Sequence, residues 1–265
     1  MKFNAACLQL TSNNSPKDNL YQVIDLSEKV ISEGADIILT PENTFLFTLD
    51  QNELLEKSEE YTDGHCIKET IKFVKSKKIW FLIGATPVKV KNSIYNRSIL
   101  INPNGEVVST YDKIHMFDVN LPNGENYEES KKFKAGKDLI ISKLPWGNLG
   151  LSICYDLRFP NHYRELMKKG AEFLTVPSAF TKNTGERHWH ILLRSRAIEN
   201  FCYVFAPAQT GIHFNNRSTY GHAMIISPDG EVLCEKKKDI GFVISEINTE
   251  SIRKLRLEIP SVSLD

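Results

Sequence analysis

The sequence predicts an α/β fold, a four-layer α-β-β-α sandwich made of two similar halves. Short apolar strands alternate with amphipathic helices along the 265 residues, which is typical of sheets covered by helices. Two pairs of segments recur in the same order: GADIILTP (34–41) resembles GAEFLTVP (170–177), and INPNGEVV (101–108) resembles ISPDGEVL (226–233). This order indicates an internal duplication with a pseudo-twofold. No Pro/Gly/Ser-rich linker separates the halves, so one domain over residues 1–265 is predicted.

The first half begins with a buried strand at Phe3–Leu10. Ser15 and Pro16 then provide an N-cap and a first-turn proline for a helix that Gly34 can close. The remaining predicted elements are a strand at Ile37–Thr40 stopped by Pro41, a helix around Ile67, Ile71 and Val74, a strand at Trp80–Ala85, and a hairpin of Ile94–Ile101 and Glu106–Tyr111.

The second half repeats this order of elements. They are a strand at Leu149–Cys154, a helix at Pro160–Lys169, a strand at Phe173–Val176 stopped by Pro177, a helix at His188–Asn200, a strand at Tyr203–Ala208, and a hairpin of Tyr220–Ser227 and Glu231–Cys234. Helices cover one face of each sheet, so we expect the two free sheet faces to pack together. The loops after Pro41 and Pro177 should then open at the same end of the two sheets.

Composition excludes several classes of protein. Lys+Arg and Asp+Glu both number 33, and this balance argues against a nucleic-acid binder or a protein of anionic membranes. The longest apolar runs, such as Ile79–Ala85, are strand-sized and too short to span a bilayer. Five cysteines without a CxxC motif argue against a disulfide framework and a zinc site, and fit a cytoplasmic protein. His188 and His190 lack further metal ligands nearby in the sequence, so we expect no metal and no cofactor.

One cysteine is placed for chemistry. Cys154 ends a predicted strand just before a helix, where α/β folds position ligands, and its thiol is a candidate nucleophile. The alternative is a buried structural cysteine. Glu42 follows a strand and a proline and could act as a base, while Lys113 leaves a strand among apolar residues and could stabilise an oxyanion. Taken singly, both residues also fit ordinary surface charges.

The three segments together resemble the nitrilase, or carbon–nitrogen hydrolase, superfamily. The motifs are LTPENTF, YDKIHMFDV and ICYDLRFP, and the resemblance extends over about residues 1–260. It implies Glu42 as general base, Lys113 as stabiliser of the tetrahedral intermediate, and Cys154 as the nucleophile that forms a thioester. It also implies an oxyanion hole from Lys113 and the Tyr155 N–H. A second glutamate that supports the lysine is assigned to Glu129, with its neighbour Glu128 as the alternative.

Residues 177–200 and 208–230 resemble the branch of small amidases that hydrolyse 2-oxo acid amides. The resemblance implies hydrolysis of a carboxylate-bearing amide to the acid and ammonia, with deaminated glutathione favoured over 2-oxoglutaramate. Arg158 would bind the substrate carboxylate through its bidentate fork, although an ion pair with Asp156 is the alternative. Further pocket residues are Tyr155, Phe117, Phe180 and Thr184.

Other functions remain open at this stage. An N-carbamoyl-amino-acid hydrolase or aliphatic amidase would use the same triad, and a catalytically silent scaffold would share the fold. The expected partners are a small-molecule amide and water, with no nucleic acid and no membrane. By resemblance, the protein is expected to form a homodimer or a larger homo-oligomer.

Overall fold

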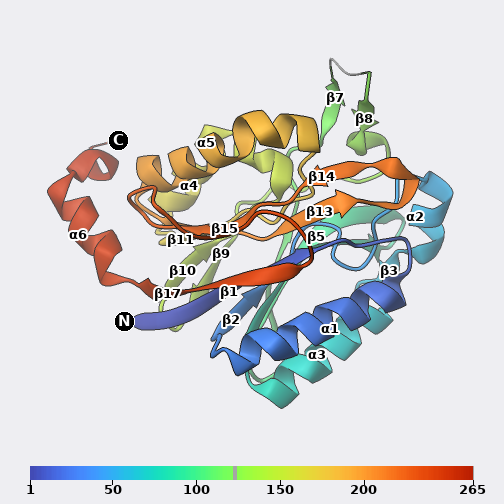
Figure 1. Ribbon diagram of the computed structural model, residues 1–265, viewed down its shortest axis with the longest axis horizontal. Helices are drawn as coiled ribbons and strands as arrows, with labels where there is room; N and C mark the ends of the chain where they lie inside the picture. Colours follow the sequence, from blue (N-terminus) through green and yellow to red (C-terminus); the bar gives the residue numbers. More distant parts are fainter. Residues whose placement is uncertain (122–123, 265) are drawn as a thin grey trace.

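The computed structural model describes residues 1–121 and 124–264 as two sheets between layers of helices (Figure 1). Helices α1 (Pro16–Ser32) and α3 (His65–Lys77) lie on the outer face of one sheet. Helices α4 (Pro160–Lys168) and α5 (Lys182–Asn200) lie on the outer face of the other. The predicted four-layer sandwich is therefore confirmed.

The first sheet has the order β14-β13-β1-β2-β4-β5-β6, with β17 also paired to β1 and β3 to β4. Its strands are β1 (Lys2–Leu10), β2 (Ile37–Leu39), β3 (Glu59–Glu60), β4 (Trp80–Val90), β5 (Ser93–Ile101), β6 (Val107–Asp112), β13 (Ala208–Ile212), β14 (Ser218–Tyr220) and β17 (Gly241–Asn248).

The second sheet has the order β16-β15-β12-β11-β10-β9. Its strands are β9 (Ile141–Leu144), β10 (Gly147–Gly150), β11 (Phe173–Thr175), β12 (Tyr203–Ala206), β15 (Ala223–Ile226) and β16 (Val232–Lys236). The run β10-β11-β12-β15-β16 repeats the run β1-β2-β4-β5-β6, because in each the first three strands are parallel and the last two are antiparallel. This matching topology agrees with the duplication seen in the sequence.

Smaller elements complete the described chain. They are α2 (Gln51–Lys57), α6 (Glu250–Glu258), the two-stranded pair β7 (Asp118–Asn120) and β8 (Asn126–Glu128), and the 3₁₀ helices η1 (Glu129–Lys131), η2 (Cys154–Arg158), η3 (Phe214–Asn216) and η4 (Pro260–Ser263). No helix among the described residues is both long and apolar enough to cross a membrane.

Strand β1 shows how the layers are held together. Alternate side chains of a strand point to opposite faces. Phe3, Ala5 and Cys7 join the apolar cluster that includes residues of the second sheet. Leu8 and Leu10 pack instead with the cluster that includes α1 and α3. Burial on both faces explains why this strand is a nearly continuous apolar run.

Two predicted strands are wrong because the chain crosses between the sheets within them. The predicted strand Tyr203–Ala208 is split at Pro207, with β12 in the second sheet and β13 in the first. The predicted strand Tyr220–Ser227 is split at Gly221 and His222, whose φ angles of 75° and 59° turn the chain back from β14 to β15. Parts of the second half therefore extend the sheet of the first.

Three element boundaries also differ from the prediction by more than three residues. Strand β4 continues to Val90, five residues beyond the predicted end at Ala85. Strand β10 ends at Gly150, not at Cys154, because residues 151–153 leave the sheet before the turn that carries Cys154. Helix α5 begins at Lys182, six residues before the predicted start at His188. Its first turn lacks an apolar stripe, so hydrophobic periodicity does not reveal it.

Candidate active site

One cavity lies where the strands carrying the predicted residues end. Its volume is about 260 Å³. All nine predicted site residues line it, namely Glu42, Lys113, Phe117, Glu129, Cys154, Tyr155, Arg158, Phe180 and Thr184. The fold thus brings together residues that are up to 142 positions apart in the chain.

Glu42 lies at the centre of a polar network. It follows β2 and is only 4% exposed. Its Oε1 accepts hydrogen bonds from Lys113 Nζ at 2.8 Å and Asn96 Nδ2 at 2.9 Å, and its Oε2 accepts one from the Ala179 N–H at 2.9 Å. The Cys154 thiol lies on the wall of the same cavity, where it and this carboxylate influence each other's pKa. Glu42 therefore bonds the lysine directly and is a neighbour of the cysteine.

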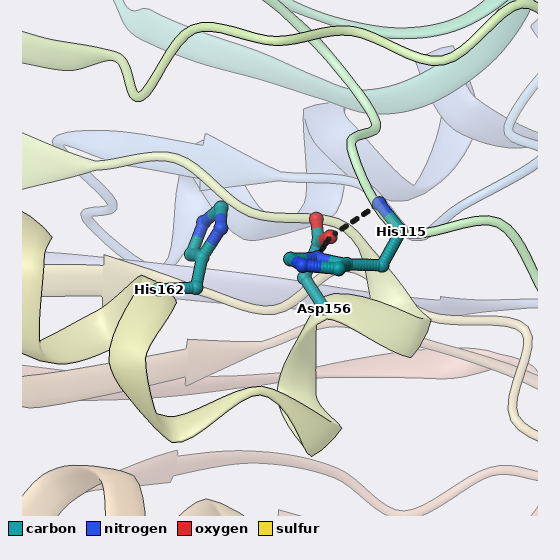
Figure 2. A group of neighbouring side chains, drawn as sticks. All are labelled: His115, Asp156 and His162. Carbon is teal, nitrogen blue, oxygen red and sulfur yellow. Dashed lines mark hydrogen bonds and ion pairs between the residues drawn. The ribbon is translucent and has the colours of Figure 1, made fainter.

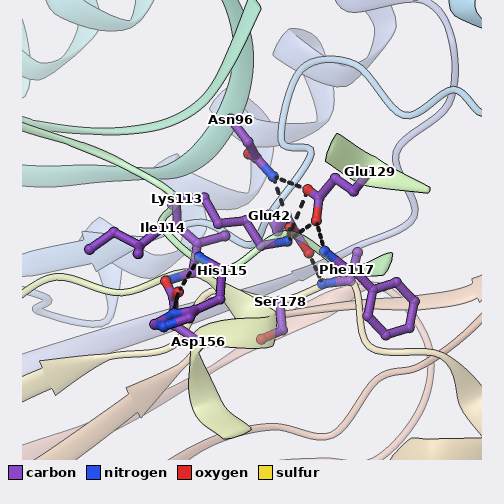
Figure 3. A network of polar contacts seen from close by, with 12 residues as sticks. Glu42, Asn96, Lys113, Ile114, His115, Phe117, Glu129, Asp156 and Ser178 are labelled. Carbon is purple, nitrogen blue, oxygen red and sulfur yellow. Dashed lines mark hydrogen bonds and ion pairs between the residues drawn. The ribbon is translucent and has the colours of Figure 1, made fainter. Parts of the chain in front are cut away.

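Lys113 lies between two carboxylates (Figure 3). Its Nζ is 2.8 Å from Glu42 Oε1 and 2.8 Å from Glu129 Oε2. Glu129 also accepts a 2.6 Å hydrogen bond from the Phe117 N–H. The alternative residue, Glu128, forms an exposed ion pair with Lys131 at 2.7 Å. The second glutamate of the network is therefore Glu129.

Cys154 is held in an unusual backbone conformation. Its φ is 47°, in the left-handed region that costs a residue with a side chain about 1–2 kcal/mol. The Cys154 N–H donates to the Pro177 carbonyl at 3.0 Å, which holds the turn against the loop after β11. The thiol is 8% exposed and lies on the cavity wall.

These contacts fix the resting protonation states. Burial alone would raise the pKa of Glu42, but the Lys113 charge and the hydrogen bonds to the carboxylate outweigh it and lower this pKa. Burial alone would lower the pKa of Lys113, but Glu129 and Glu42 raise it. Burial and the nearby Glu42 charge raise the pKa of the Cys154 thiol. At neutral pH the site therefore holds a carboxylate, an ammonium and a neutral thiol.

The turn after Cys154 supplies a backbone donor. Tyr155 is the second residue of η2, and the first N–H groups of a helix have no acceptor within it. The Lys113 ammonium lies in the same cavity. A charged donor and a backbone N–H beside a thiol are the components of an oxyanion hole.

Arg158 has no carboxylate partner of its own. Asp156, the alternative partner predicted from the sequence, is fully buried and bonded elsewhere. Among residues 1–121 and 124–264, Arg158 forms no ion pair. Its Nη1 lies 3.3 Å from His188 Nδ1, and its guanidinium carbon lies 5.2 Å from the centre of the Phe180 ring. The charge is thus available to a ligand in the cavity.

Asp156 connects the segments that carry Lys113 and Cys154. Its Oδ2 accepts hydrogen bonds from the Tyr111 hydroxyl at 2.6 Å and the Ile153 N–H at 2.8 Å. Its Oδ1 accepts from His115 Nδ1 at 2.7 Å and the His115 N–H at 3.1 Å. Tyr111 and His115 flank Lys113 in the chain, and Ile153 precedes Cys154.

His115, Asp156 and His162 also form a group of metal-ligand type (Figure 2). Both Asp156 oxygens already accept hydrogen bonds from the backbone and side chains of its neighbours. The His162 Nε2 instead faces the Leu151 carbonyl at 3.4 Å. We therefore interpret this group as a hydrogen-bonded support beneath the site.

Sequence reasoning missed three residues of the site. Asn96, on β5, donates to both Glu42 and Glu129. Ala179 contributes only backbone groups, its N–H to Glu42 and its carbonyl to Arg217, and no side-chain pattern can reveal them. Arg217 lines the cavity from the loop after η3. Arg217 lies within residues 208–230, a segment that resembles the small amidases, and this position could have marked it as a candidate site residue.

The comparisons with known proteins decide the family. The carbon-nitrogen hydrolase model matches residues 4–257. The chain belongs to this family. It is accordingly a hydrolase that acts on C–N bonds, which fits a cavity that holds a thiol, a carboxylate and an ammonium.

Similar proteins cover nearly the whole carbon-nitrogen hydrolase chain. A deaminated glutathione amidase of Synechocystis sp. is 42% identical over 267 residues, covering 97% of this chain and 96% of the relative. The crystal structure of the Caenorhabditis elegans NitFhit protein has a TM-score of 0.94 at 34% identity and covers all of this chain, which spans 65% of that protein. Saccharomyces cerevisiae Nit3, of the nitrilase superfamily, has a TM-score of 0.88 at 25% identity, covering 98% of this chain and 94% of that one.

Proposed function

We propose that this protein is an amidase that hydrolyses deaminated glutathione through a thioester on Cys154. The observation that supports it most is that one buried carboxylate, Glu42, bonds the Lys113 ammonium and shares a cavity with the Cys154 thiol. The 42% identity to a relative with this name supports the choice of substrate.

The first half of the reaction follows from the resting protonation states. Because the thiol is neutral and Glu42 is ionised, Glu42 removes the thiol proton as the sulfur attacks the amide carbon. The C–S bond forms, and the carbonyl oxygen becomes an oxyanion held by the Lys113 ammonium and the Tyr155 N–H. When the intermediate collapses, the C–N bond breaks and protonated Glu42 returns its proton to the leaving amine.

The second half regenerates the enzyme. Glu42 removes a proton from a water molecule, and the resulting hydroxide attacks the thioester carbon. The same oxyanion hole holds the second intermediate, the C–S bond breaks, and the sulfur regains the proton from Glu42. Lys113 stays charged throughout because its raised pKa keeps it protonated beside Glu129 and Glu42. Glu129 and Asn96 are proposed to hold Lys113 and Glu42 in place.

The remaining predicted residues are proposed to bind the acyl part of the substrate. Arg158 offers an unpaired guanidinium for the carboxylate of the 2-oxo acid. Phe117, Tyr155 and Phe180 would provide apolar contact, and the Thr184 hydroxyl a polar one. Thr184 is already 2.7 Å from the Thr181 hydroxyl, which orients it.

The two candidate substrates release different amines. In deaminated glutathione the amide nitrogen belongs to cysteinylglycine, so cleavage there releases that dipeptide, and the release of ammonia expected from the sequence is wrong for this substrate. In 2-oxoglutaramate the nitrogen is a primary amide, and cleavage releases ammonia. Both reactions release 2-oxoglutarate, so one assay of this acid compares the two substrates on equal terms.

The test measures the 2-oxoglutarate that purified protein releases from deaminated glutathione and from 2-oxoglutaramate. Hydrolysis of an N-carbamoyl amino acid is measured separately, by the amino acid it releases. We expect deaminated glutathione to have the highest kcat/KM and Cys154→Ala to remove turnover while the thermal unfolding midpoint stays unchanged. Cys7→Ala, at a buried cysteine outside the cavity, is the control for loss of a thiol. No turnover of deaminated glutathione by protein with an intact Cys154 thiol would refute the proposal. A Cys154 thiol that does not react with a thiol reagent would favour the alternative of a catalytically silent scaffold protein.

We further propose that the enzyme works in the cytoplasm as a homo-oligomer. The five cysteines are all free, which fits a reducing compartment. Ile191 and Ile198 on α5 are 67% and 43% exposed, and such apolar side chains suit a subunit contact. Light scattering after gel filtration tests the assembly, and a monomer of 30.2 kDa would refute it.

A further inference from the structure

Arg217 lines the same cavity as Lys113 and Arg158, but the reaction proposed above does not use it. It lies between η3 and β14. Its guanidinium carbon is 4.9 Å from the centre of the Tyr127 ring and 5.2 Å from that of Phe47. Its Nη2 donates to the Ala179 carbonyl at 2.9 Å. Two aromatic rings and one backbone bond therefore fix the plane of the guanidinium at the cavity wall.

The hydrogen-bonding capacity of Arg217 is only partly used. Its Nε is buried and has no hydrogen-bond partner. In the part of the chain that the structure describes, no carboxylate pairs with Arg217. A buried donor without an acceptor, on a group that is always charged, is unfavourable until an anion binds. An arginine in this state suits a carboxylate, which matches its fork.

A different cation on this wall is already engaged. The Lys132 ammonium also lines the cavity, but it donates to the Leu49 carbonyl. Because Lys132 already donates to a backbone carbonyl while Arg217 keeps an unused donor, Arg217 is the group on this wall that we expect an anionic ligand to contact.

Ala179 places Arg217 on the side of the leaving group. The Ala179 N–H donates to Glu42 Oε2, and the Ala179 carbonyl accepts from Arg217. One residue thus holds both the general base and the guanidinium. Glu42 must protonate the departing amine, so the leaving group departs beside Glu42. Arg158 instead belongs to η2, the helix of Cys154 itself, which carries the acyl group.

We propose that Arg217 binds the carboxylate at the far end of the leaving group. The enzyme then prefers amides whose nitrogen carries a short acidic peptide over primary amides. This inference rests on the proposed amidase function and adds a subsite to it. A dipeptide reaches about 7 Å from the scissile nitrogen when extended, which allows its terminal carboxylate to leave the reacting centre. Arg158 and Arg217 would bind the two ends of one dianionic substrate.

The test compares three substrates that all release 2-oxoglutarate. They are deaminated glutathione, the same molecule with its terminal carboxylate converted to an amide, and 2-oxoglutaramate. We expect Arg217→Met to lower kcat/KM for the first by about 10- to 150-fold, the range for a lost hydrogen bond to a charged group. Its effect on the other two should stay within about threefold. Arg253→Met, which removes an exposed arginine of α6 outside the cavity lining, is the matched control and should change none of them.

The wild-type enzyme gives a second measurement that needs no variant. It should cleave deaminated glutathione at least about tenfold more efficiently than the terminal amide. If Arg217→Met does not fold, this comparison alone decides. Equal efficiency on both, or an equal loss on all three substrates in Arg217→Met, would overturn the inference while leaving the amidase function intact. Wild-type protein without activity on deaminated glutathione would refute the function and the inference together.

Discussion

Asp156→Asn tests whether one buried carboxylate holds the two reacting segments together. Asp156 accepts four hydrogen bonds, two on each oxygen, from Tyr111, Ile153 and His115. Replacing one oxygen with an NH₂ group sets a donor against one backbone N–H, of Ile153 or His115, whereas the side-chain partner on that oxygen can turn its hydroxyl or change tautomer to accept. The substitution keeps the shape of the side chain, so it creates no cavity. Asp156→Ala would leave all four donors without an acceptor and is expected not to fold.

The size of the effect follows from the one backbone hydrogen bond that must be lost. A buried polar group without its partner costs about 1–3 kcal/mol, so Asp156→Asn should lower the free energy of unfolding by about that amount. For a chain of this length each kcal/mol corresponds to roughly 2–4 °C, and we expect the unfolding midpoint to fall by about 5 °C. Hydrogen bonds to the charged form lower the pKa of Asp156 in spite of its burial. Its stabilising contribution is therefore complete above about pH 4 and is lost as pH falls through the lower folded pKa.

The assay combines thermal unfolding with steady-state kinetics. In Asp156→Asn we expect kcat to fall more than tenfold with KM nearly unchanged, because Lys113 and Cys154 lose their common support while the substrate-binding residues remain. Asp229→Asn, at the exposed turn between β15 and β16, is the control for loss of one negative charge. A midpoint within about 2 °C of wild type, with kcat within twofold, would refute this account of Asp156.

Further predictions concern the triad and the contact between the halves. Glu42→Gln should lower kcat/KM by about 10²–10⁴-fold, the usual contribution of a general base. The same variant should alkylate faster at Cys154 with iodoacetamide at pH 8, because removal of the Glu42 charge lowers the pKa of the thiol; an unchanged or slower rate would contradict this electrostatic coupling. In wild type, the alkylation rate should still be rising at pH 9, whereas a plateau below pH 8 would indicate a thiolate at rest. Gly84→Ala should lower the unfolding midpoint by at least about 5 °C, because its Cβ would overlap the Thr40 carbonyl oxygen and lie 2.6 Å from the Cβ of Pro177 in the other half. A midpoint equal to wild type in a thermal melt would show that the backbone yields there.

The sequence allowed prediction of the fold where structure follows from local pattern. Strand β2 is apolar and stops at Pro41, and its counterpart β11 stops at Pro177, so both ends could be predicted from composition. The grouping of Glu42, Lys113 and Cys154 in one cavity could be predicted because each follows a strand within a specific motif. Each of these features depends on residues close together in the chain.

The parts that could not be predicted depend on tertiary contacts. Hydrophobic periodicity shows that β12 and β13 are strands, but it does not show which sheet each joins. The φ of 47° at Cys154 is held by hydrogen bonds to the Pro177 carbonyl and to Asp156. The residues next to Cys154 in the sequence do not reveal these contacts. Arg217 could not be predicted for the same reason. It reaches the cavity only because β13 and β14 join the sheet of the first half.

The arrangement of charge in the cavity explains how a neutral chain can select an anionic substrate. Without a net charge the protein has no long-range field to steer an anion, so selection must come from groups inside the cavity. The two carboxylates beside Lys113, those of Glu42 and Glu129, are both paired with its ammonium. Arg158 and Arg217 are the arginines left without a carboxylate in the described part of the cavity, so they are the groups that an anion can neutralise. A substrate with one carboxylate satisfies one of them, whereas a substrate with two, on either side of the scissile amide, satisfies both. The same argument explains why efficiency should depend on the leaving group even though the chemistry at Cys154 does not.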